Sequence, residues 1–131
     1  MEPRQSATIL IVDDDEDILE LFEENLSFMG DYSIVKAYSG KEALVLIEKA
    51  PPDLILLDIM MEDMDGTTVC KAIKSGEKTS HIPVIAVTAI HKVHEPRYRE
   101  IMDSGVDEYL EKPFEYDELK GAIEQQLERL R

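Results

Sequence analysis

Short apolar runs alternate along the chain with stretches in which apolar residues recur at helical spacing. The runs 9–12 and 54–57 are wholly apolar, which is typical of strands covered on both faces of a sheet. Further strands are predicted at 32–38, 83–89 and 108–111. Because a helical stretch follows each strand, the pattern predicts an α/β domain built on a parallel sheet.

The stretches between the strands have the start and stop signals of helices. In the first stretch, the apolar residues that recur at helical spacing before Gly30 are Ile18, Leu21, Phe22, Leu26 and Met29. Ser39 and Glu42 have the spacing of a capping box, in which each side chain accepts a hydrogen bond from the other residue's backbone N–H. Helices are also expected at 67–75 after a turn at Asp65-Gly66, between about 96 and 105, and from about 116. The apolar stripe of the last helix consists of Leu119, Ile123, Leu127 and Leu130.

Composition narrows the class of protein. The chain of 131 residues is sized for one domain, 1–131, with its core at about 7–130. Its 14 Lys and Arg against 29 Asp and Glu give a formal charge of −15, which argues against direct binding of nucleic acid or anionic lipid. No apolar run approaches the about 20 residues that span a bilayer. The single cysteine, Cys70, and a start without a secretory signal favour the cytoplasm.

Polar residues fall at the carboxyl ends of the predicted strands. Asp13 and Asp14 follow the first strand and Asp58 ends the third, while Thr88 lies near the end of the fourth and Lys112 follows the fifth. In open parallel sheets ligands bind at these ends, at the switch point, which for strand order 2-1-3-4-5 lies between the first and third strands. The three aspartates should therefore converge there.

Converging carboxylates repel one another, so their clustering calls for a hard divalent cation, and Mg²⁺ is the natural candidate. With a cation and the ammonium of Lys112 on either side, a carboxylate can attack a phosphoryl group, because both cations offset the charge on the transferring oxygens. We identify Asp58 as this nucleophile. Lys112 would pair with phosphoryl oxygens, and Thr88 would hydrogen-bond one of them once the group is attached.

Four stretches of the sequence resemble the receiver domain of bacterial two-component response regulators. They are Ile9 to Asp15, Pro52 to Gly66, Val87 to Ala89 and Tyr109 to Phe114, and they occur in the order that the family has. The resemblance implies the doubly wound, flavodoxin-like fold with five parallel strands in the order 2-1-3-4-5. It also implies a signalling module rather than an enzyme, one that receives a phosphoryl group from the phosphohistidine of a sensor histidine kinase or phosphotransfer protein.

The resemblance assigns roles to the residues of the site. Asp58 would carry the phosphoryl group, and Mg²⁺ would be held by Asp14, Asp58 and the backbone carbonyl of Met60, with Asp13 acting mostly through water. The family's peptide bond after Lys112 is usually cis, which would aim this side chain into the site.

The resemblance also implies a switch. Thr88 would turn toward the phosphoryl group, and Tyr109 would move inward with it. The two movements would reshape the surface formed by the fourth helix, fifth strand and fifth helix. Through this surface the family controls an output partner or domain, and commonly pairs as a homodimer.

Three positions depart from the family's pattern. Glu62 stands where proline is usual, which removes a rigid turn and adds a negative charge beside an acidic site. Met60 and Ile90, two residues beyond Asp58 and Thr88, are apolar where some relatives carry polar groups that position the attacking water. We therefore expect a slowly hydrolysed acyl phosphate.

Two other classes of function fit parts of the sequence. Asp13-x-Asp15, Thr88 and Lys112 resemble the first three motifs of haloacid-dehalogenase-like phosphatases, in which Asp13 would be the nucleophile and Asp58 would have no role. A flavodoxin-like electron carrier would need a phosphate-cradling loop after the first strand, where the carboxylates of this chain would repel a flavin phosphate. The receiver interpretation is favoured, and the sequence leaves open whether the chain is stand-alone or part of a longer regulator.

Overall fold

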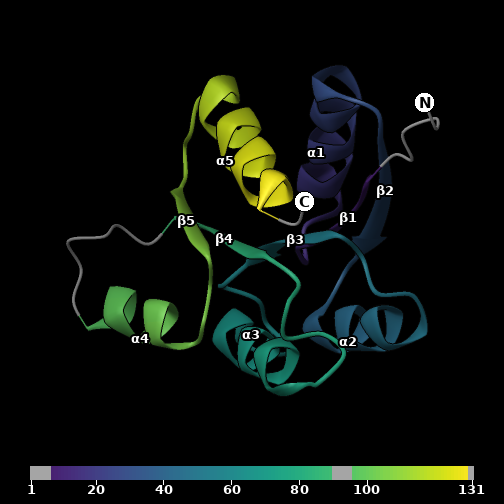
Figure 1. The fold of residues 1–131 in the computed structure, drawn as a ribbon. Coiled ribbons are helices and arrows are strands. Elements are labelled where there is room, and N and C mark those ends of the chain that lie inside the picture. Colours follow the sequence, from purple (N-terminus) through teal and green to yellow (C-terminus); the bar gives the residue numbers. More distant parts are fainter. Residues whose placement is uncertain (1–6, 90–95, 130–131) are drawn as a thin grey trace.

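One parallel sheet organises the computed structural model, which describes residues 7–89 and 96–129 (Figure 1). Within these residues, five strands are hydrogen-bonded in the order β2-β1-β3-β4-β5, and each neighbouring pair is parallel. The strands are β1 (Ala7–Val12), β2 (Tyr32–Ala37), β3 (Leu54–Asp58), β4 (Val84–Thr88) and β5 (Glu108–Glu111). The predicted strand order is confirmed, whereas Ile90 and Leu130 lie outside the described residues.

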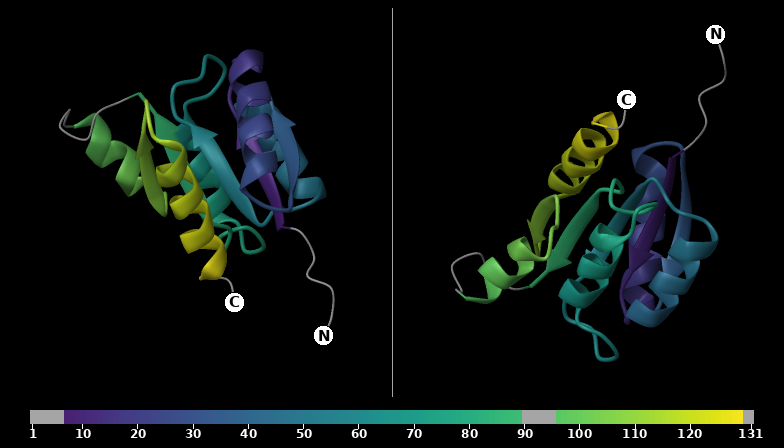
Figure 2. Two further views of the ribbon diagram at one scale, coloured as in Figure 1. Left: turned by 90° about the horizontal axis from the view of Figure 1, so that it is seen from above. Right: turned by 60° about the horizontal axis from the view of Figure 1, so that its bottom comes forward.

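Helices cover both faces of the sheet, as the doubly wound fold requires. They are α1 (Glu16–Met29), α2 (Gly40–Lys49), α3 (Gly66–Ser75), α4 (Arg97–Asp103) and α5 (Tyr116–Glu128). Helices α1 and α5 lie on one face, and α2, α3 and α4 lie on the other (Figures 1 and 2). In the part of the chain that the structure describes, no helix has the length and apolar character needed to cross a membrane.

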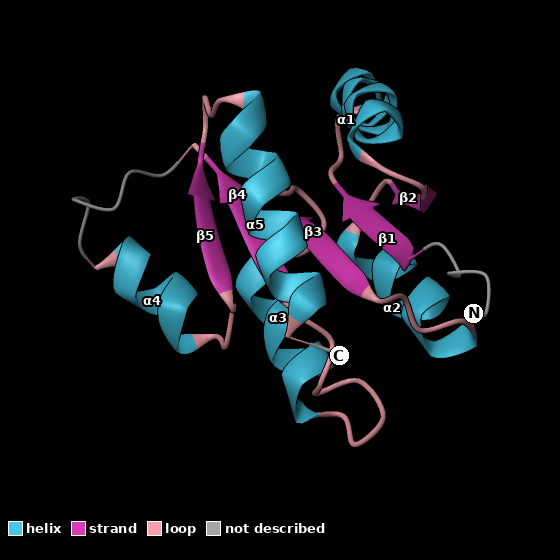
Figure 3. Cartoon of the chain, turned by 45° about the horizontal axis from the view of Figure 1, so that its top comes forward, coloured by secondary structure: helices cyan, strands magenta, loops and turns pink. Residues whose placement is uncertain are grey.

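The sheet divides the core into two clusters, because successive side chains of a strand point to opposite faces. Strand β3, in the middle of the sheet, is buried at every position. Strand β2 lies at the edge of the sheet (Figure 3). Its positions 32–36 alternate between intermediate and exposed, and Ala37 is buried. The wholly apolar run 54–57 therefore belongs to the central strand, as its composition predicts.

The buried face of α1 differs from the predicted one. Leu19, Phe22, Leu26 and Met29 are buried, whereas Leu21 is 57% exposed. Residues spaced three or four positions apart share one side of a helix, so the side that contains Leu19 faces the sheet and Leu21 points away from it. Hydrophobicity alone does not distinguish these two leucines.

Two helix starts also differ in detail from their predictions. Ser39 Oγ accepts a hydrogen bond from Glu42 N–H at 3.0 Å, as the capping box predicts. The Glu42 carboxylate instead accepts from the N–H of Tyr38 at 2.8 Å, so the box is only half formed. Asp65-Gly66, predicted as a turn, begins α3: Asp65 is the N-cap and Gly66 the first helical residue.

Candidate functional site

The site lies at the carboxyl ends of β1 and β3, in the middle of the sheet. Val12 and Leu57 are partners in the strand pairing, so Asp13 and Asp58 lie side by side at the carboxyl ends of β1 and β3. One carboxylate oxygen from each of Asp13, Asp14 and Asp58 lies within 4.8 Å of the others. The structure therefore brings together the three aspartates that the sequence analysis expects to converge.

The three carboxylates differ in their surroundings. Asp13 and Asp58 are only 3% and 8% exposed, and Asp14 is exposed. The two buried carboxylates each accept a hydrogen bond from the backbone N–H of a residue two positions further along the chain. Asp13 Oδ1 accepts from the N–H of Asp15 at 2.9 Å, and Asp58 Oδ1 accepts from that of Met60 at 3.3 Å. These bonds orient the carboxylates before any ligand binds.

Lys112 supplies positive charge to the cluster. Its Nζ lies 3.5 Å from Asp13 Oδ2, with the side chain 25% exposed. Its backbone N–H donates to the carbonyl of Thr88 at 2.8 Å, which fixes the loop after β5 to the end of β4. The peptide bond between Lys112 and Pro113 is cis, in agreement with the expectation from the resemblance.

Burial makes negative charge costly in this cluster. Burial, with the charges of Asp13 and Asp14, raises the pKa of Asp58 from 3.8 to about 6, although Lys112 and the Met60 N–H oppose the shift. Burial also raises the pKa of Asp13, against the opposing effects of the Asp15 N–H and Lys112. A bound cation would relieve this repulsion, and oxygen-only donors are the ones that Mg²⁺ prefers. The residues present therefore fit a magnesium ion.

Thr88 and Tyr109 lie on β4 and β5, the two strands that follow β3 in the sheet. Thr88 is fully buried and follows Val87, the partner of Asp58 in the strand pairing. Tyr109 is 9% exposed, and its ring packs edge-to-face on that of Tyr98 from α4, with centroids 5.0 Å apart. The Tyr109 ring therefore lies inside the fold in this structure, whereas the resemblance has it move inward on phosphorylation.

Gly66 packs against the backbone of Asp58 and Ile59. A Cβ atom on Gly66 would lie 2.6 Å from both the Asp58 carbonyl oxygen and Ile59 Cα. Its N–H donates to the Ile59 carbonyl at 2.8 Å. The start of α3 thus packs directly on the backbone that carries Asp58, and no larger residue fits. In the sequence, Gly66 is recognised only as part of a turn and as the end of a stretch that resembles the receiver family, because this contact depends on tertiary packing.

The segment 59–65 after Asp58 is anchored to two helices by contacts that the sequence analysis missed. The Asp63 carboxylate accepts hydrogen bonds from the N–H groups of Gly40 and Lys41, both at 3.1 Å, at the start of α2. The Asp65 carboxylate forms a salt bridge with Arg97, the first residue of α4. These partners are 22 or more positions apart in the sequence, so no local pattern reveals them.

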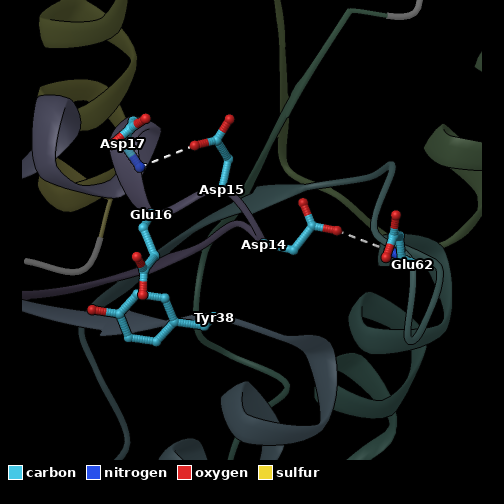
Figure 4. A pocket seen from close by; sticks show the side chains of 6 residues that line it. All are labelled: Asp14, Asp15, Glu16, Asp17, Tyr38 and Glu62. Atoms are coloured by element: carbon cyan, nitrogen blue, oxygen red, sulfur yellow. Dashed lines mark hydrogen bonds between the residues drawn. The ribbon is translucent and has the colours of Figure 1, made fainter.

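An open acidic depression adjoins the cluster (Figure 4). It is lined by Asp14, Asp15, Glu16, Asp17, Tyr38 and Glu62. The Asp15 side chain accepts from the N–H of Asp17 at 2.9 Å and so caps α1. On the other side of the depression, Glu62 N–H donates to Asp14 Oδ2 at 3.0 Å. The surface beside Asp14 is therefore strongly negative.

Comparisons with known proteins agree with this geometry. The family model for the response regulator receiver domain matches residues 9–124. The DNA-binding dual master transcriptional regulator RpaA of Synechocystis is 38% identical over 121 residues, which are 92% of this chain and 49% of RpaA. The response regulator MprA of Mycolicibacterium vanbaalenii is 40% identical over 121 residues, 92% of this chain and 50% of MprA. The chain thus spans about half the length of these relatives.

Solved structures resemble the whole described fold. The CheY-like response regulator receiver domain protein of Methanospirillum hungatei superposes with a TM-score of 0.86 at 30% sequence identity. The match covers 95% of this chain and 96% of that one. The similarity therefore extends over nearly the whole length of both chains.

Proposed function

Because the chain belongs to the family of response regulator receiver domains, we propose that Asp58 accepts a phosphoryl group from the phosphohistidine of a sensor histidine kinase or phosphotransfer protein. The observation that carries this proposal is the position of Asp58: it is buried at the end of the central strand, within 4.8 Å of two other carboxylates. Its pKa of about 6 leaves it mostly ionised at neutral pH. A partly desolvated carboxylate of this kind is a competent nucleophile.

In the transfer step, a carboxylate oxygen of Asp58 attacks phosphorus and forms a P–O bond. The P–N bond of the phosphohistidine breaks, and its electron pair returns to the imidazole nitrogen of the donor. The Lys112 ammonium, 3.5 Å from Asp13, lies at hand to pair with the phosphoryl oxygens as a point charge. The module assists its own phosphorylation and slow dephosphorylation, and we do not class it as an enzyme.

Asp14, Asp58 and the backbone carbonyl of Met60 would hold Mg²⁺, with Asp13 acting mostly through water. When bound, the ion supplies positive charge against the phosphoryl oxygens. Asp13 and Asp14 themselves raise the pKa of Asp58 by their negative charge, so a cation among them also favours ionised Asp58. The hydrogen bonds from Asp15 and Met60 hold two of the carboxylates in place.

The switch belongs to the same proposal. Thr88 would hydrogen-bond the phosphoryl group, and Tyr109 would readjust with it. The contact between the Tyr109 and Tyr98 rings links β5 to α4, which gives such a movement a route to the α4-β5-α5 surface. There it would control an output partner or domain, or a homodimer.

The setting of the chain is also a proposal. Residues 1–131 would form its single domain, with a core at about 7–130, and act in the cytoplasm, without direct contact to nucleic acid or membrane. The charge of −15 and the unpaired, buried Cys70 support this setting. Met60, apolar and 60% exposed two residues beyond Asp58, supports slow hydrolysis of the acyl phosphate, because its side chain does not position a water molecule.

Intact-mass spectrometry after incubation with Mg²⁺ and acetyl phosphate tests the proposal. The unchanged protein should gain one phosphoryl group, and Asp58→Asn or added chelator should abolish the gain. A label that needs Asp13 and survives Asp58→Asn would favour the phosphatase interpretation. The absence of a label in every variant would contradict a phosphoacceptor role and leave a receiver that acts by protein contact alone.

A further inference from the structure

The hydrogen bond between Glu62 and Asp14 joins the two loops that hold the proposed metal ligands. The N–H of Glu62 donates to Asp14 Oδ2 at 3.0 Å, across 48 positions of the sequence. Asp14 belongs to the carboxylate cluster, and Met60 lies two residues before Glu62. The Glu62 side chain is exposed on the rim of the acidic depression (Figure 4). Glu62 thus contacts Asp14 of the cluster through its backbone and lines the acidic depression beside Asp14 with its side chain.

The backbone contact depends on the residue type at position 62. Proline, the usual residue of the family at this position, has no N–H and cannot donate. Asp14 is exposed, so without this bond its carboxylate would sample several rotamers. With the bond, one oxygen of Asp14 is engaged by the loop, and the carboxylate has one orientation when a cation arrives. The bond also holds the segment that contains Met60 close to Asp14.

The side chain of Glu62 acts differently from its backbone. Its carboxylate is separate from the cluster and solvated, so it attracts a cation only through the field that it adds to Asp14, Asp15 and the other acids of the rim. Such a field is screened by salt, because the Debye length falls from about 10 Å at 0.1 M to about 3 Å at 1 M. The hydrogen bond acts over a short distance and does not depend on salt in this way. The two contributions can therefore be separated by experiment.

We propose that Glu62 is a positioning residue for Mg²⁺, which acts through its N–H on Asp14 and through its carboxylate on the local field. The inference rests on the proposed function, because it assumes that the carboxylate cluster binds Mg²⁺. Its consequence is that this chain replaces the rigidity of a proline turn with a hydrogen bond between loops. Mg²⁺ binding is then coupled to the order of the segment 59–65.

Three substitutions of this exposed residue separate the two contributions. Glu62→Gln and Glu62→Ala remove the charge and keep the N–H, whereas Glu62→Pro removes both. The dissociation constant of Mg²⁺ is measured by titration calorimetry on the full chain at about 50 mM and about 1 M NaCl. Glu48→Gln, at an exposed position of α2, is the matched control for the change in net charge.

At low salt, the Gln and Ala variants should bind Mg²⁺ about two- to fivefold more weakly than the unchanged protein, and at high salt they should match it. Glu62→Pro should bind about two- to tenfold more weakly than Glu62→Ala at both salt concentrations, the range that one hydrogen bond supplies. Equal constants for the Pro and Ala variants would overturn the role of the N–H. Equal constants for the Gln variant and Glu48→Gln at low salt would overturn the role of the carboxylate.

Nuclear magnetic resonance tests the bond without proline, in case Glu62→Pro does not fold. In the unchanged protein the amide proton of Glu62 should exchange slowly with solvent, and Asp14→Ala should speed its exchange and move its resonance upfield. An unchanged resonance would overturn the inference. If the unchanged protein binds Mg²⁺ and all three Glu62 variants bind it with the same dissociation constant, this inference alone is overturned. A cluster that binds no Mg²⁺ in the unchanged protein would overturn the proposed function as well.

Discussion

Replacement of Asp58 by asparagine should stabilise the folded protein at neutral pH when divalent cations are absent. Burial, reinforced by the charges of Asp13 and Asp14, raises the pKa of Asp58 from 3.8 to about 6 in the folded state. In the unfolded chain the carboxyl is solvated and titrates near about 3.9. Between these two values the folded state keeps a proton that the unfolded state has released. Stability is therefore lost as the pH rises through this range.

The size of the effect follows from the shift in pKa. Each pKa unit corresponds to about 1.4 kcal/mol, so a shift of about two units makes ionised Asp58 cost about 3 kcal/mol of folding free energy. Asparagine is neutral and of similar shape, and its Oδ1 can still accept from the Met60 N–H. The variant should therefore gain up to about 3 kcal/mol above about pH 6, and almost nothing near pH 4.

Urea unfolding in the presence of chelator, at about pH 4, 5.5 and 7.5, measures this gain. Asp31→Asn is the matched control, because Asp31 is exposed and precedes the amino end of β2, whereas the cluster lies at the carboxyl ends of β1 and β3. Added Mg²⁺ should stabilise the unchanged protein more than it stabilises Asp58→Asn, so the difference between their free energies of unfolding should become smaller. The reasoning would be refuted if Asp58→Asn were no more stable than Asp31→Asn at about pH 7.5, or if its gain were the same at about pH 4.

Four further substitutions test the contacts that support the site. Lys112→Ala leaves the buried Asp13 carboxylate without its cation and should lower the free energy of unfolding by about 1–2 kcal/mol at about pH 7.5. The loss is smaller than for a fully buried pair because the Lys112 side chain is 25% exposed. If urea unfolding showed an equal loss at about pH 4, this expectation would be wrong. Gly66→Ala places a Cβ 2.6 Å from the Asp58 carbonyl oxygen and should cost about 1–3 kcal/mol, with a lower yield of phosphorylation by intact mass; an unchanged melting temperature would refute the contact. Arg97→Ala should cost at most about 1 kcal/mol and Asp65→Ala about 1–2 kcal/mol, because Asp65 also caps α3. A double-mutant cycle with no coupling energy would contradict the salt bridge.

The fold and the three-aspartate cluster could be predicted because local signals specify them. The runs 9–12 and 54–57 are buried on both faces, so they contain no polar residue, and each ends at an aspartate. Once both strands are placed side by side in a parallel sheet, Asp13 and Asp58 have to meet at its carboxyl edge. The convergence is therefore a consequence of strand order.

The remaining contacts depend on geometry that the sequence pattern does not contain. Leu19 and Leu21 are equally apolar, and only the packing of α1 on the sheet decides which of them is buried. The bond from Glu62 to Asp14 joins two loops, and the bond from Arg97 to Asp65 joins α4 to the start of α3. Contacts between residues so far apart in the sequence leave no periodic signal in it.

Chemical trapping of the acyl phosphate tests the central claim most directly. After incubation with Mg²⁺ and acetyl phosphate, borohydride reduces an aspartyl phosphate to homoserine, and peptide mapping by mass spectrometry then identifies the modified position. We expect homoserine at position 58, and none when Mg²⁺ is chelated or when Asp58 is replaced by asparagine. Homoserine at position 13, or a stable phosphoryl label without any reducible acyl phosphate, would contradict the assignment of Asp58 as the phosphoacceptor.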